Sequence, residues 1–526
     1  MENLYMIENK YGKLVQFKPN KAQIAFFKNM HVGGNIILKA RQLGMSTGIV
    51  MWILNELLFS ARKTAGIVDK TLTDAEAKIR KVLIAYENMD NPALEFHPIG
   101  ALIKSSVKIT SSSSQRIEFS NGSSLQAGRS LRGGTVQFLH ISELGKIAME
   151  EPKKAEEVLS GALNTIAPGN YIFAESTHEG GRVGLHYKLL RQAMENDPDN
   201  LSPVDMKFHF YPWFYDPAYS INPLTVQLRK ETIEYFEKLE QEFQLHLTPG
   251  QIAWYDRKSL QQQEAMLKEY PSTPGEAFEG NIRGAIYAKY ISEARASGRI
   301  IDFTPDPNIP VICAWDIGVS DFTSIWAIQL VGREIHWVDW YEGNNMPVSH
   351  YASVIREWDK KYNTISHHYL PHDAGYRDRN ASSYVQYLAE AGITNVTVVP
   401  RTPDVWIGIN HLRDLLKRSV FHLTNCGTPR KDELGDEHPS GLDCLEAYRT
   451  GGVDAAGRIK EIPIHDETSH SCDSARTFAE AMNRGMVGYE GMTGPGGRRG
   501  KFRFHVITGG GGQVWSDSSR PNVKVL

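Results

Sequence analysis

The sequence of 526 residues has little cysteine: four residues, no two of which form a CxxC pair. This excludes a zinc ribbon and a disulfide scaffold, and it favours a reducing compartment. The longest apolar stretch, residues 48–59, is interrupted by Asn55 and Glu56 and is too short to cross a bilayer. The first ten residues lack the apolar core of a signal peptide. We therefore expect a soluble, cytosolic protein without a membrane partner.

The chain also lacks a strong net charge. It has 58 Lys and Arg residues against 61 Asp and Glu residues, which gives a formal net charge of -3. Such a balance excludes a basic coat that binds nucleic acid through bulk charge, so any contact with DNA must be local, and metal ions can assist it. The apolar fraction of 41% is enough for sizeable cores. At roughly 150 residues per domain, the length suggests about three or four folding units.

The first half of the chain alternates short β-rich runs with helical runs. This alternation favours a parallel sheet covered by helices. The predicted strands are residues 35–38, 64–68, 116–119, 136–141 and 171–174, and the predicted helices are residues 47–58 and 74–89.

The second half has a different organisation. Residues 224–270 are polar and rich in Glu, Gln and Lys, which indicates the helices of a small lid or linker unit, and EYPSTPGEAF marks its end. From residue 311, three β-rich runs follow one another with short gaps and predict an antiparallel meander. Helices are expected at residues 348–362 and 382–391. The last 42 residues are rich in glycine and basic, so we expect a flexible tail there.

A candidate phosphate-binding loop, KARQLGMST, follows the first predicted strand and precedes a helix. Free backbone N–H groups at such a helix end face an anion. The usual pattern G-x-x-x-x-G-K-[ST] is met only in part, because Gly44 and Ser46 fit while Met45 replaces the lysine and Lys39 the first glycine. The cation that phosphate needs can come from Lys39 or Arg41. The alternative is a basic turn before a buried helix.

A carboxylate follows a second strand. The run VQFLHISE ends in Ser142 and Glu143, where many nucleotide hydrolases have Asp-Glu. Glu143 can orient and deprotonate an attacking water. Without the aspartate, Mg²⁺ would rely on Ser46, or Thr47, and on water. The alternative for Glu143 is a solvated residue at a strand end.

A third strand ends in YIFAEST and is followed by HEGG. Ser176 and Thr177 at this strand end can sense the γ-phosphate of a nucleotide and couple it to movement. The alternative is a turn, since Ser, Thr and Gly favour turns in any protein.

Three aspartates in the second half suggest a second site. Asp316 lies within the apolar run CAWDIG, Asp373 in YLPHDAG, and Asp473 before a helical pattern in SHSCDSARTFAEA. A buried aspartate is costly unless it is paired or holds a metal. Two Mg²⁺ or Mn²⁺ ions roughly 3.5–4 Å apart would neutralise the cluster and activate water for phosphodiester cleavage. Taken singly, each aspartate can instead be a cap or turn residue. Nearby candidates for further ligands are Asp321, His372 and His470.

In this order and spacing, the motifs resemble those of the large terminase subunit of tailed bacteriophages, the motor and nuclease that packages viral DNA. The resemblance covers residues 17–485 and is carried by KARQLGMST, SLRGGTVQFLHISE, IFAESTHEGG, EYPSTPGEAF, AWDIGVSDFTS, LPHDAG and SHSCDSARTF. It implies an α/β protein with an N-terminal P-loop ATPase of the additional-strand (ASCE) type and a C-terminal RNase H-like nuclease. The implied domains are the ATPase at 1–222, a lid at 223–300, the nuclease at 301–485 and a flexible tail at 486–526.

The resemblance also implies roles for individual residues. Lys39 is similar to a shifted phosphate lysine found in some members, Ser46 takes the Mg²⁺-ligand position and Glu143 matches the catalytic glutamate. Ser176 and Thr177 match the coupling motif. Arg41, ahead of Arg132, is the candidate arginine that stabilises charge on the transferred phosphoryl group. Asp316, Asp373 and Asp473 fall on the three nuclease acids. The implied nucleotide-binding residues are Gln23 (to adenine), Lys39, Arg41, Gln42, Gly44, Met45, Ser46 and Thr47.

The implied cofactors are ATP and Mg²⁺ or Mn²⁺, for both ATPase and nuclease. The implied partners are double-stranded viral DNA, contacted mostly at its phosphates, the portal protein, a small terminase subunit and further copies in a ring, expected to be a pentamer. The implied location is the host cytoplasm, with transient docking on the procapsid and absence from the mature virion. Two alternatives stay open: a recombination or repair nuclease with a helicase-like ATPase, and a catalytically degenerate scaffold that binds portal and DNA.

Overall fold

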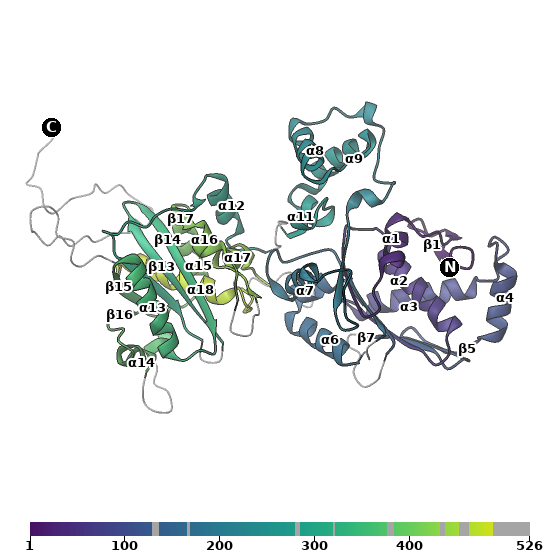
Figure 1. Cartoon of the computed structure of the whole chain (residues 1–526), viewed down its shortest axis with the longest axis horizontal. Coiled ribbons are helices and arrows are strands. Elements are labelled where there is room, and N and C mark those ends of the chain that lie inside the picture. The colour runs from purple at the N-terminus through teal and green to yellow at the C-terminus, as the bar shows by residue number, and fades with distance from the viewer. Residues whose placement is uncertain are drawn as a thin grey trace, which may run out of the picture. The chain divides into compact units, whose positions relative to one another are not determined.

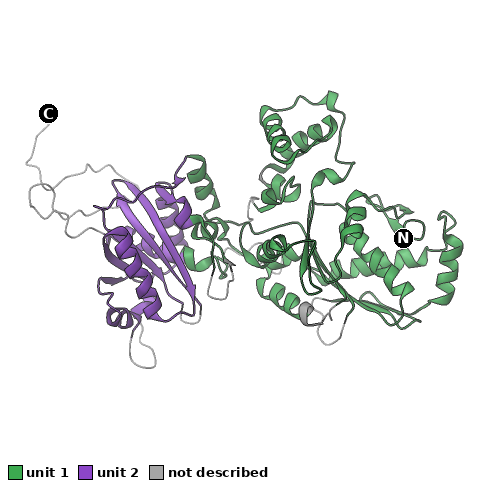
Figure 2. Cartoon of the chain, viewed as in Figure 1, with its two compact units in different colours: residues 1–297, 427–472 green, residues 298–426, 473–526 purple. Residues whose placement is uncertain are grey.

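The computed structural model describes residues 1–128, 136–165, 169–278, 284–318, 321–375, 383–431, 437–451 and 462–487. The chain divides into two compact units (Figure 2). Unit 1 comprises Met1–Ser297 and Gly427–Cys472, and unit 2 comprises Gly298–Cys426 and the chain from Asp473 onward. The sequence predicted one uninterrupted domain over residues 301–485, whereas Gly427–Cys472 groups with unit 1. The predicted tail lies outside the described residues, except for its first two positions.

Unit 1 is built on an eight-stranded sheet of order β10-β3-β9-β8-β4-β7-β6-β5. The six strands from β10 to β7 are mutually parallel, and β6 and β5 extend the sheet in antiparallel fashion. The predicted parallel sheet is therefore confirmed. Its strands are β3 (Gly34–Lys39), β4 (Thr64–Val68), β5 (Ile109–Ser112), β6 (Arg116–Phe119), β7 (Ser124–Gly128), β8 (Phe138–Ser142), β9 (Tyr171–Ser176) and β10 (Met206–Tyr211).

Strand β3 is buried along its whole length, as a central parallel strand with helices on both faces must be. Its residues alternate between two cores. Ile37 packs into the core that contains the apolar helix α2 (Met45–Phe59) and α3 (Leu72–Glu87). Ile36 and Leu38 pack into the core of α7 (Gly184–Glu195). Figure 1 shows these helices on opposite faces of the sheet.

The polar stretch predicted to be helical contains α8 (Lys230–Phe243), α9 (Pro249–Gln262) and α10 (Met266–Glu269). Aromatic rings hold α8 and α9 together, because Tyr235 stacks on Tyr255 with ring centroids 5.1 Å apart. The remaining elements of unit 1 are β1 (Met6–Glu8), β2 (Leu14–Gln16), α1 (Lys21–Asn29), α4 (His97–Ser106), α5 (Leu144–Glu150), α6 (Pro152–Thr165), α11 (Pro274–Phe278), α12 (Ala288–Ala296), β18 (Arg430–Lys431), β19 (Glu437–His438) and α17 (Gly441–Ala447).

Unit 2 contains a seven-stranded mixed sheet of order β11-β17-β14-β13-β12-β15-β16. The predicted meander is confirmed, since β12, β13 and β14 pair in antiparallel fashion. Strand β15 runs parallel to β12, and β17 runs parallel to β14. The strands are β11 (Ile300–Ile301), β12 (Val311–Asp316), β13 (Phe322–Val331), β14 (Glu334–Asn344), β15 (Ile365–Leu370), β16 (Val396–Val398) and β17 (Ser419–His422). The helices are α13 (Val348–Tyr362), α14 (Tyr384–Glu390), α15 (Val405–Leu416), α16 (Leu423–Gly427) and α18 (Ser469–Asn483). Helices α16 and α18 cross the unit boundaries.

Aromatic side chains fill one core of unit 2. Trp337 of β14 is fully buried, stacks on Phe421 with ring centroids 5.4 Å apart, and meets Phe478 of α18 edge-on at 5.8 Å. Its indole N–H donates to Ser419 Oγ at 2.9 Å. Trp337 thus joins β14, β17 and α18. No helix within the described ranges has both the length and the apolar composition needed to cross a membrane.

Replacing Trp337 by alanine should destabilise unit 2 by about 3–5 kcal/mol, because a large buried ring is removed and a cavity is left. Urea unfolding followed by circular dichroism would measure the loss. The control is Trp337→Phe, which keeps an aromatic ring and loses mainly the hydrogen bond to Ser419, at a cost of about 1 kcal/mol. An unfolding midpoint of Trp337→Ala equal to that of the wild type would contradict this account of the core.

Candidate functional site

The loop between β3 and α2 has the backbone of an anion-binding turn. Lys39 ends β3, Gln42 and Gly44 have φ angles of 61° and 70°, and α2 begins at Met45. Gly44 is the N-cap of α2 and has no side chain to cap the helix. The first N–H groups of α2 therefore need partners from outside the helix, and a phosphate is such a partner.

Helix α1 supports this loop from behind. Asn20 and Gln23 form a capping box, and their side-chain amides donate to Leu43 O at 2.8 Å and to Gly44 O at 2.7 Å. Gln23 is 4% exposed, and both ends of its amide are engaged. The structure therefore places Gln23 as a support of the loop, and its contact with adenine stays a prediction.

Lys39 lies between two carboxylates. Its Nζ is 3.4 Å from Glu143 Oε1 and 3.1 Å from Glu175 Oε2, and the residue is 5% exposed. Burial lowers the pKa of Lys39, but the charges of Glu175 and Glu143 more than offset burial and raise this pKa to about 12. The structure thus brings together Lys39 and Glu143, and it holds the lysine in its charged form.

Glu175, which the sequence analysis did not single out, is the centre of the site. It is fully buried on β9, and its Oε1 accepts hydrogen bonds from Ser46 Oγ and from Ser142 Oγ (2.8 Å), with His140 Nε2 at 3.4 Å. Burial alone would raise the pKa of Glu175, but the Lys39 ammonium holds it well below its usual range. Glu175 is therefore a buried carboxylate that stays ionised.

Sheet order explains how these groups meet. Strand β9 lies between β3 and β8, so Glu175 pairs in register with Ile37 on one side and with Ser142 on the other. The carboxyl ends of parallel strands meet at one edge of the sheet, where ligands bind in open α/β folds. Residues more than 100 positions apart in the chain are thereby brought to one edge.

Glu143 adopts a strained backbone conformation directly after β8. Its φ and ψ are 58° and 39°, in the left-handed region, and its N–H donates to Glu175 O at 2.7 Å. Its carboxylate contacts Lys39 and also Lys146, whose Nζ is 2.8 Å from Oε2. Such a conformation costs about 1 kcal/mol or more and persists where neighbours fix it, so Glu143 is a positioned residue.

A cavity of about 560 Å³ opens beside these groups. This volume suits a nucleotide-sized ligand, and the walls carry both lysines and carboxylates. The lining residues of unit 1 are Arg41, Ser46, Asp69, Lys70, Asp74, Ala77, Lys78, Lys81, Ser142, Glu143, Lys146, Met149, Glu150, Glu179, Lys268, Glu269, Arg449, Thr450, Gly451 and Ile464.

Two arginines line the cavity. Arg41, with a side chain 53% exposed, pairs with Glu269 at 3.0 Å. Arg449, which the sequence analysis missed, is buried; it pairs with Asp466 at 2.8 Å and donates to Met149 O at 3.3 Å. No sequence pattern pointed to Arg449, because it lies in a segment without a motif, 300 residues beyond the Met149 carbonyl that it contacts. The other predicted arginine, Arg132, lies outside the described residues.

The residues after Glu175 are buried as well. Ser176 and Thr177 are at most 2% exposed, and among the described residues their hydroxyls have no hydrogen-bond partner. They lie against α5, because a side chain added at Gly145 would come within 2.6 Å of Thr177 O. His178 and His186 follow, with stacked rings 5.3 Å apart. Burial lowers the pKa of His178 to about 4.

The loop offers oxygen donors that suit Mg²⁺. Ser46 and Ser142 supply hydroxyls that donate to the ionised carboxylate of Glu175, and oxygen ligands are what Mg²⁺ prefers. Lys81 Nζ donates to Thr47 Oγ1 at 3.1 Å and so takes up one of its lone pairs, whereas Ser46 Oγ donates to Glu175 and keeps its lone pairs for a cation. Ser46 is therefore the stronger candidate ligand.

In unit 2, sheet register places the predicted acids near one edge. Asp316 ends β12 opposite Ser324, whose hydroxyl accepts from Ser474 at 3.1 Å. Asp473 precedes Ser474 and pairs with Arg476 at 3.0 Å. Asp373 lies in the 3-10 helix His372–Gly375, directly after β15, the parallel neighbour of β12.

Among the described residues, the carboxylates of Asp316, Asp373 and Asp473 do not form one group whose oxygens all lie within 4.8 Å of one another. Like charges repel without cations, and the Arg476 guanidinium holds Asp473. Carboxylate oxygens are a type of ligand that Mg²⁺ and Mn²⁺ prefer. In a two-metal site the ligands are divided between two ions, so the three carboxylates need not all bind the same ion.

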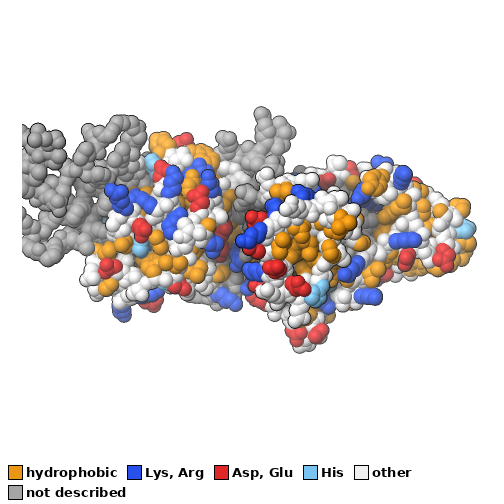
Figure 3. All heavy atoms as spheres, turned by 90° about the horizontal axis from the view of Figure 1, so that it is seen from above, with side chains coloured by type: hydrophobic (Ala, Val, Ile, Leu, Met, Phe, Trp, Pro, Cys, Tyr) orange, Lys and Arg blue, Asp and Glu red, His pale blue; other side chains and the backbone are white. Residues whose placement is uncertain are grey.

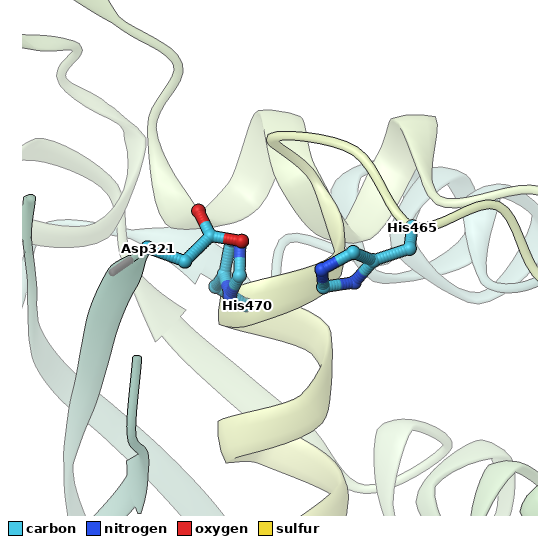
Figure 4. A group of neighbouring side chains, drawn as sticks. All are labelled: Asp321, His465 and His470. Carbon is cyan, nitrogen blue, oxygen red and sulfur yellow. The ribbon is translucent and has the colours of Figure 1, made fainter. Parts of the chain in front are cut away.

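His470, one of the predicted further ligands, is buried in the first turn of α18, with its ring 5.2 Å from that of His465. Figure 4 shows both rings, together with Asp321, which precedes β13 in unit 2. His465 was not singled out from the sequence, because it lies in a segment without a motif. On the face seen in Figure 3, basic and acidic side chains are interspersed.

No protein-family model and no curated protein sequence matches the chain. Among solved structures, the chain is similar to the large terminase of bacteriophage HK97, at 12% identity over 91% of this chain and 98% of that chain, with a TM-score of 0.41. It is similar to the large terminase of a thermophilic bacteriophage in complex with ADP, at 14% identity over 88% and 98% of the two chains (TM-score 0.27). It is also similar to the nuclease domain of the P22 large terminase, at 16% identity over 37% and 90% (TM-score 0.26). The predicted resemblance to phage large terminases is thus found among solved structures too, but at these values function must follow from the residues of this chain.

The buried histidines predict that unit 1 loses stability in mild acid. The pKa of His178 is about 4 in the folded chain and 6.5 ordinarily, so the unfolded chain binds more protons between these values. Stability should fall as the pH drops from 6.5 towards 4. At pH 5, His178 alone should lower the free energy of unfolding by about 2 kcal/mol relative to neutral pH.

Urea unfolding at pH 7.5 and pH 5.0 would measure this loss, which should be smaller by that amount in His178→Gln. The control is His246→Gln, a histidine with a side chain 78% exposed, which should lose as much as the wild type. An equal loss in His178→Gln and in the wild type would show that His178 is not responsible.

Proposed function

We propose that this chain is the ATP-driven motor and nuclease that packages viral DNA. Unit 1 would hydrolyse ATP and drive double-stranded DNA through the portal into the procapsid, and unit 2 would cut concatemeric DNA at the start and end of each round. The observation that supports this most is the position of Lys39 between Glu143 and Glu175, at the end of a strand–loop–helix and beside a cavity of nucleotide size.

In this proposal the loop binds the phosphates of ATP. The free N–H groups of α2 and the Lys39 ammonium would contact the β- and γ-phosphates. Ser46, with Glu175 behind it, would hold Mg²⁺, which neutralises phosphate charge when it is bound. Glu143 would orient a water and accept its proton, since its strained backbone and its contacts with Lys39 and Lys146 fix its carboxylate. Arg41 would stabilise charge on the transferred phosphoryl group.

Movement would pass from the loop to the lid helices α8 and α9. Residues next to these helices hold the backbone of Arg41. The Arg41 N–H donates to Glu269 O at 2.8 Å, and the Arg41 carbonyl accepts from Tyr219 Oη at 2.8 Å. Tyr219 stacks on Trp254 of α9 with ring centroids 4.5 Å apart. Ser176 and Thr177, buried beside Glu175, would report the state of the γ-phosphate to α5.

For the nuclease, we propose that Asp316, Asp373 and Asp473 hold two Mg²⁺ or Mn²⁺ ions. Such ions activate water and stabilise the leaving oxygen in phosphodiester cleavage. The strand β12, its parallel neighbour β15 and the helix α18 would form the RNase H-like core that carries these acids. The proposed partners are double-stranded DNA, the portal protein, a small terminase subunit and further copies in a ring, with the chain docked on the procapsid in the host cytoplasm.

The ATPase proposal predicts that Lys39→Ala and Glu143→Gln each lower ATP turnover by about 100-fold or more, because one removes the phosphate cation and the other the general base. Phosphate release by the full chain, measured with DNA and portal present, tests this. Matched controls are Lys28→Ala and Glu87→Gln, which change exposed residues on α1 and α3 and should leave turnover unchanged. Equal and negligible turnover in the wild type and in both site variants would favour a scaffold over a motor.

The nuclease proposal predicts that Asp316→Ala and Asp473→Ala abolish plasmid cleavage in Mg²⁺ or Mn²⁺ while ATP turnover persists. Gel analysis of supercoiled plasmid measures the first activity and phosphate release the second. Asp414→Ala, on the exposed face of α15, is the control and should cut normally. Full cutting by either site variant would refute the assignment of these acids.

A further inference from the structure

Position 142 lacks the carboxylate that nucleotide hydrolases usually carry there. Ser142 ends β8, and the sheet places Glu175 of β9 directly opposite it. Residues opposite each other in a sheet direct their side chains to the same face. The hydrogen bond of 2.8 Å from Ser142 Oγ to Glu175 Oε1 agrees with this. A glutamate on β9 therefore brings a negative charge to the place that an aspartate at 142 would fill.

The two oxygens of Glu175 have different partners. Oε2 faces the Lys39 ammonium, while Oε1 accepts from the hydroxyls of Ser46 and Ser142 and lies 3.4 Å from His140 Nε2. Both serines line the cavity, whereas Glu175 itself is fully buried behind them. A hydroxyl that donates its proton to a carboxylate keeps its lone pairs for a cation on the other side. Oε1 thus fixes the direction in which Ser46 can act as a ligand.

A purely structural role for Glu175 explains less. Lys39 already has Glu143 as a counter-ion, at 3.4 Å, and a second carboxylate buried only for charge balance would cost several kcal/mol of desolvation. Charge balance with Lys39 also gives no reason for Oε1 to meet two hydroxyls that face the cavity. If Glu175 also orients a metal ligand, the contacts of both of its carboxylate oxygens, Oε1 and Oε2, are explained.

We propose that Glu175 replaces the missing aspartate at position 142 as the positioning residue of the nucleotide's Mg²⁺. It acts through Ser46 and Ser142, by orienting their hydroxyls towards the cavity and by adding negative charge behind them. This inference rests on the proposed nucleotide site, and it makes β9 the strand that supplies the anionic partner of the metal.

The test compares the dissociation constant of ATPγS for the full chain in Mg²⁺ and in EDTA. The wild type should bind more tightly in Mg²⁺. Glu175→Gln keeps an acceptor oxygen for the two serines but removes the charge, so the gain from Mg²⁺ should fall by about 10–100-fold, as for other residues that orient a metal ligand. Its affinity in EDTA should not fall, because Lys39 loses one competing carboxylate.

A second variant tests whether a carboxylate on the neighbouring strand β8 can restore the effect of Mg²⁺ that Glu175→Gln loses. The double variant Ser142→Asp with Glu175→Gln should recover most of the Mg²⁺-dependent gain. The control is Asp256→Asn, which neutralises another fully buried carboxylate, paired with Arg229 at 3.0 Å in the α8–α9 region, and should keep the wild-type gain. Thermal unfolding of each variant shows whether it is folded.

If the wild type binds ATPγS and folded Glu175→Gln gains as much affinity from Mg²⁺ as the wild type does, this inference is overturned while the proposed nucleotide site stands. If Glu175→Gln does not fold, the double variant decides, since it retains the charge: a wild-type gain supports the proposal and its absence refutes it. A wild type that does not bind ATPγS in either condition would overturn the proposed nucleotide site, and this inference with it.

Discussion

The site in unit 1 depends on one constraint: a buried charge must be paired. Lys39 and Glu175 are almost without solvent, and an isolated charge in such a place would cost far more than the stability of a domain allows. Each is stabilised by neighbouring groups: Lys39 lies between the carboxylates of Glu175 and Glu143, and Glu175 also accepts from the hydroxyls of Ser46 and Ser142. Because these partners come from the carboxyl ends of β3, β8 and β9 and from the first turn of α2, their interactions also hold the edge of the sheet together. An anionic ligand that drew Lys39 away from its carboxylates would therefore disturb three strands at once.

Much of this arrangement could be predicted along the chain. The run NIIL is buried on both faces and predicted β3, and the apolar helix α2 and the strand β4 also followed from pattern alone. Lys39 was singled out as a cation beside a candidate phosphate loop, and Glu143 as a carboxylate at a strand end, where nucleotide hydrolases carry one. The antiparallel meander of unit 2 followed from three β-rich runs too close together to allow a crossover.

Glu175, Arg449 and the grouping of Gly427–Cys472 with unit 1 were not predicted, and the reason is the same for all of them. Their positions depend on which strands and segments become neighbours, and sequence order does not contain that information. Strand β9 inserts between β3 and β8, although it follows both in the chain. Within YIFAEST, Glu175 therefore looked like one polar residue before a turn. Strands β10 and β17 were missed for another reason: their runs, MKFHFY and SVFH, are short and contain polar residues that only a sheet neighbour makes buried.

The pairing of Ser142 with Glu175 shows how a motif can be misjudged when it is compared one strand at a time. Along β8, serine in place of aspartate is a loss of charge and suggests a weakened or inactive site. Across the sheet, a negative charge is present one strand away, on Glu175, which accepts hydrogen bonds from both Ser142 and Ser46. A glutamate at 175 opposite an aspartate at 142 would bury two like charges in contact, at a cost that Lys39 alone could not offset. The serine and the glutamate are therefore best understood as one physical unit, in which each residue makes the other tolerable.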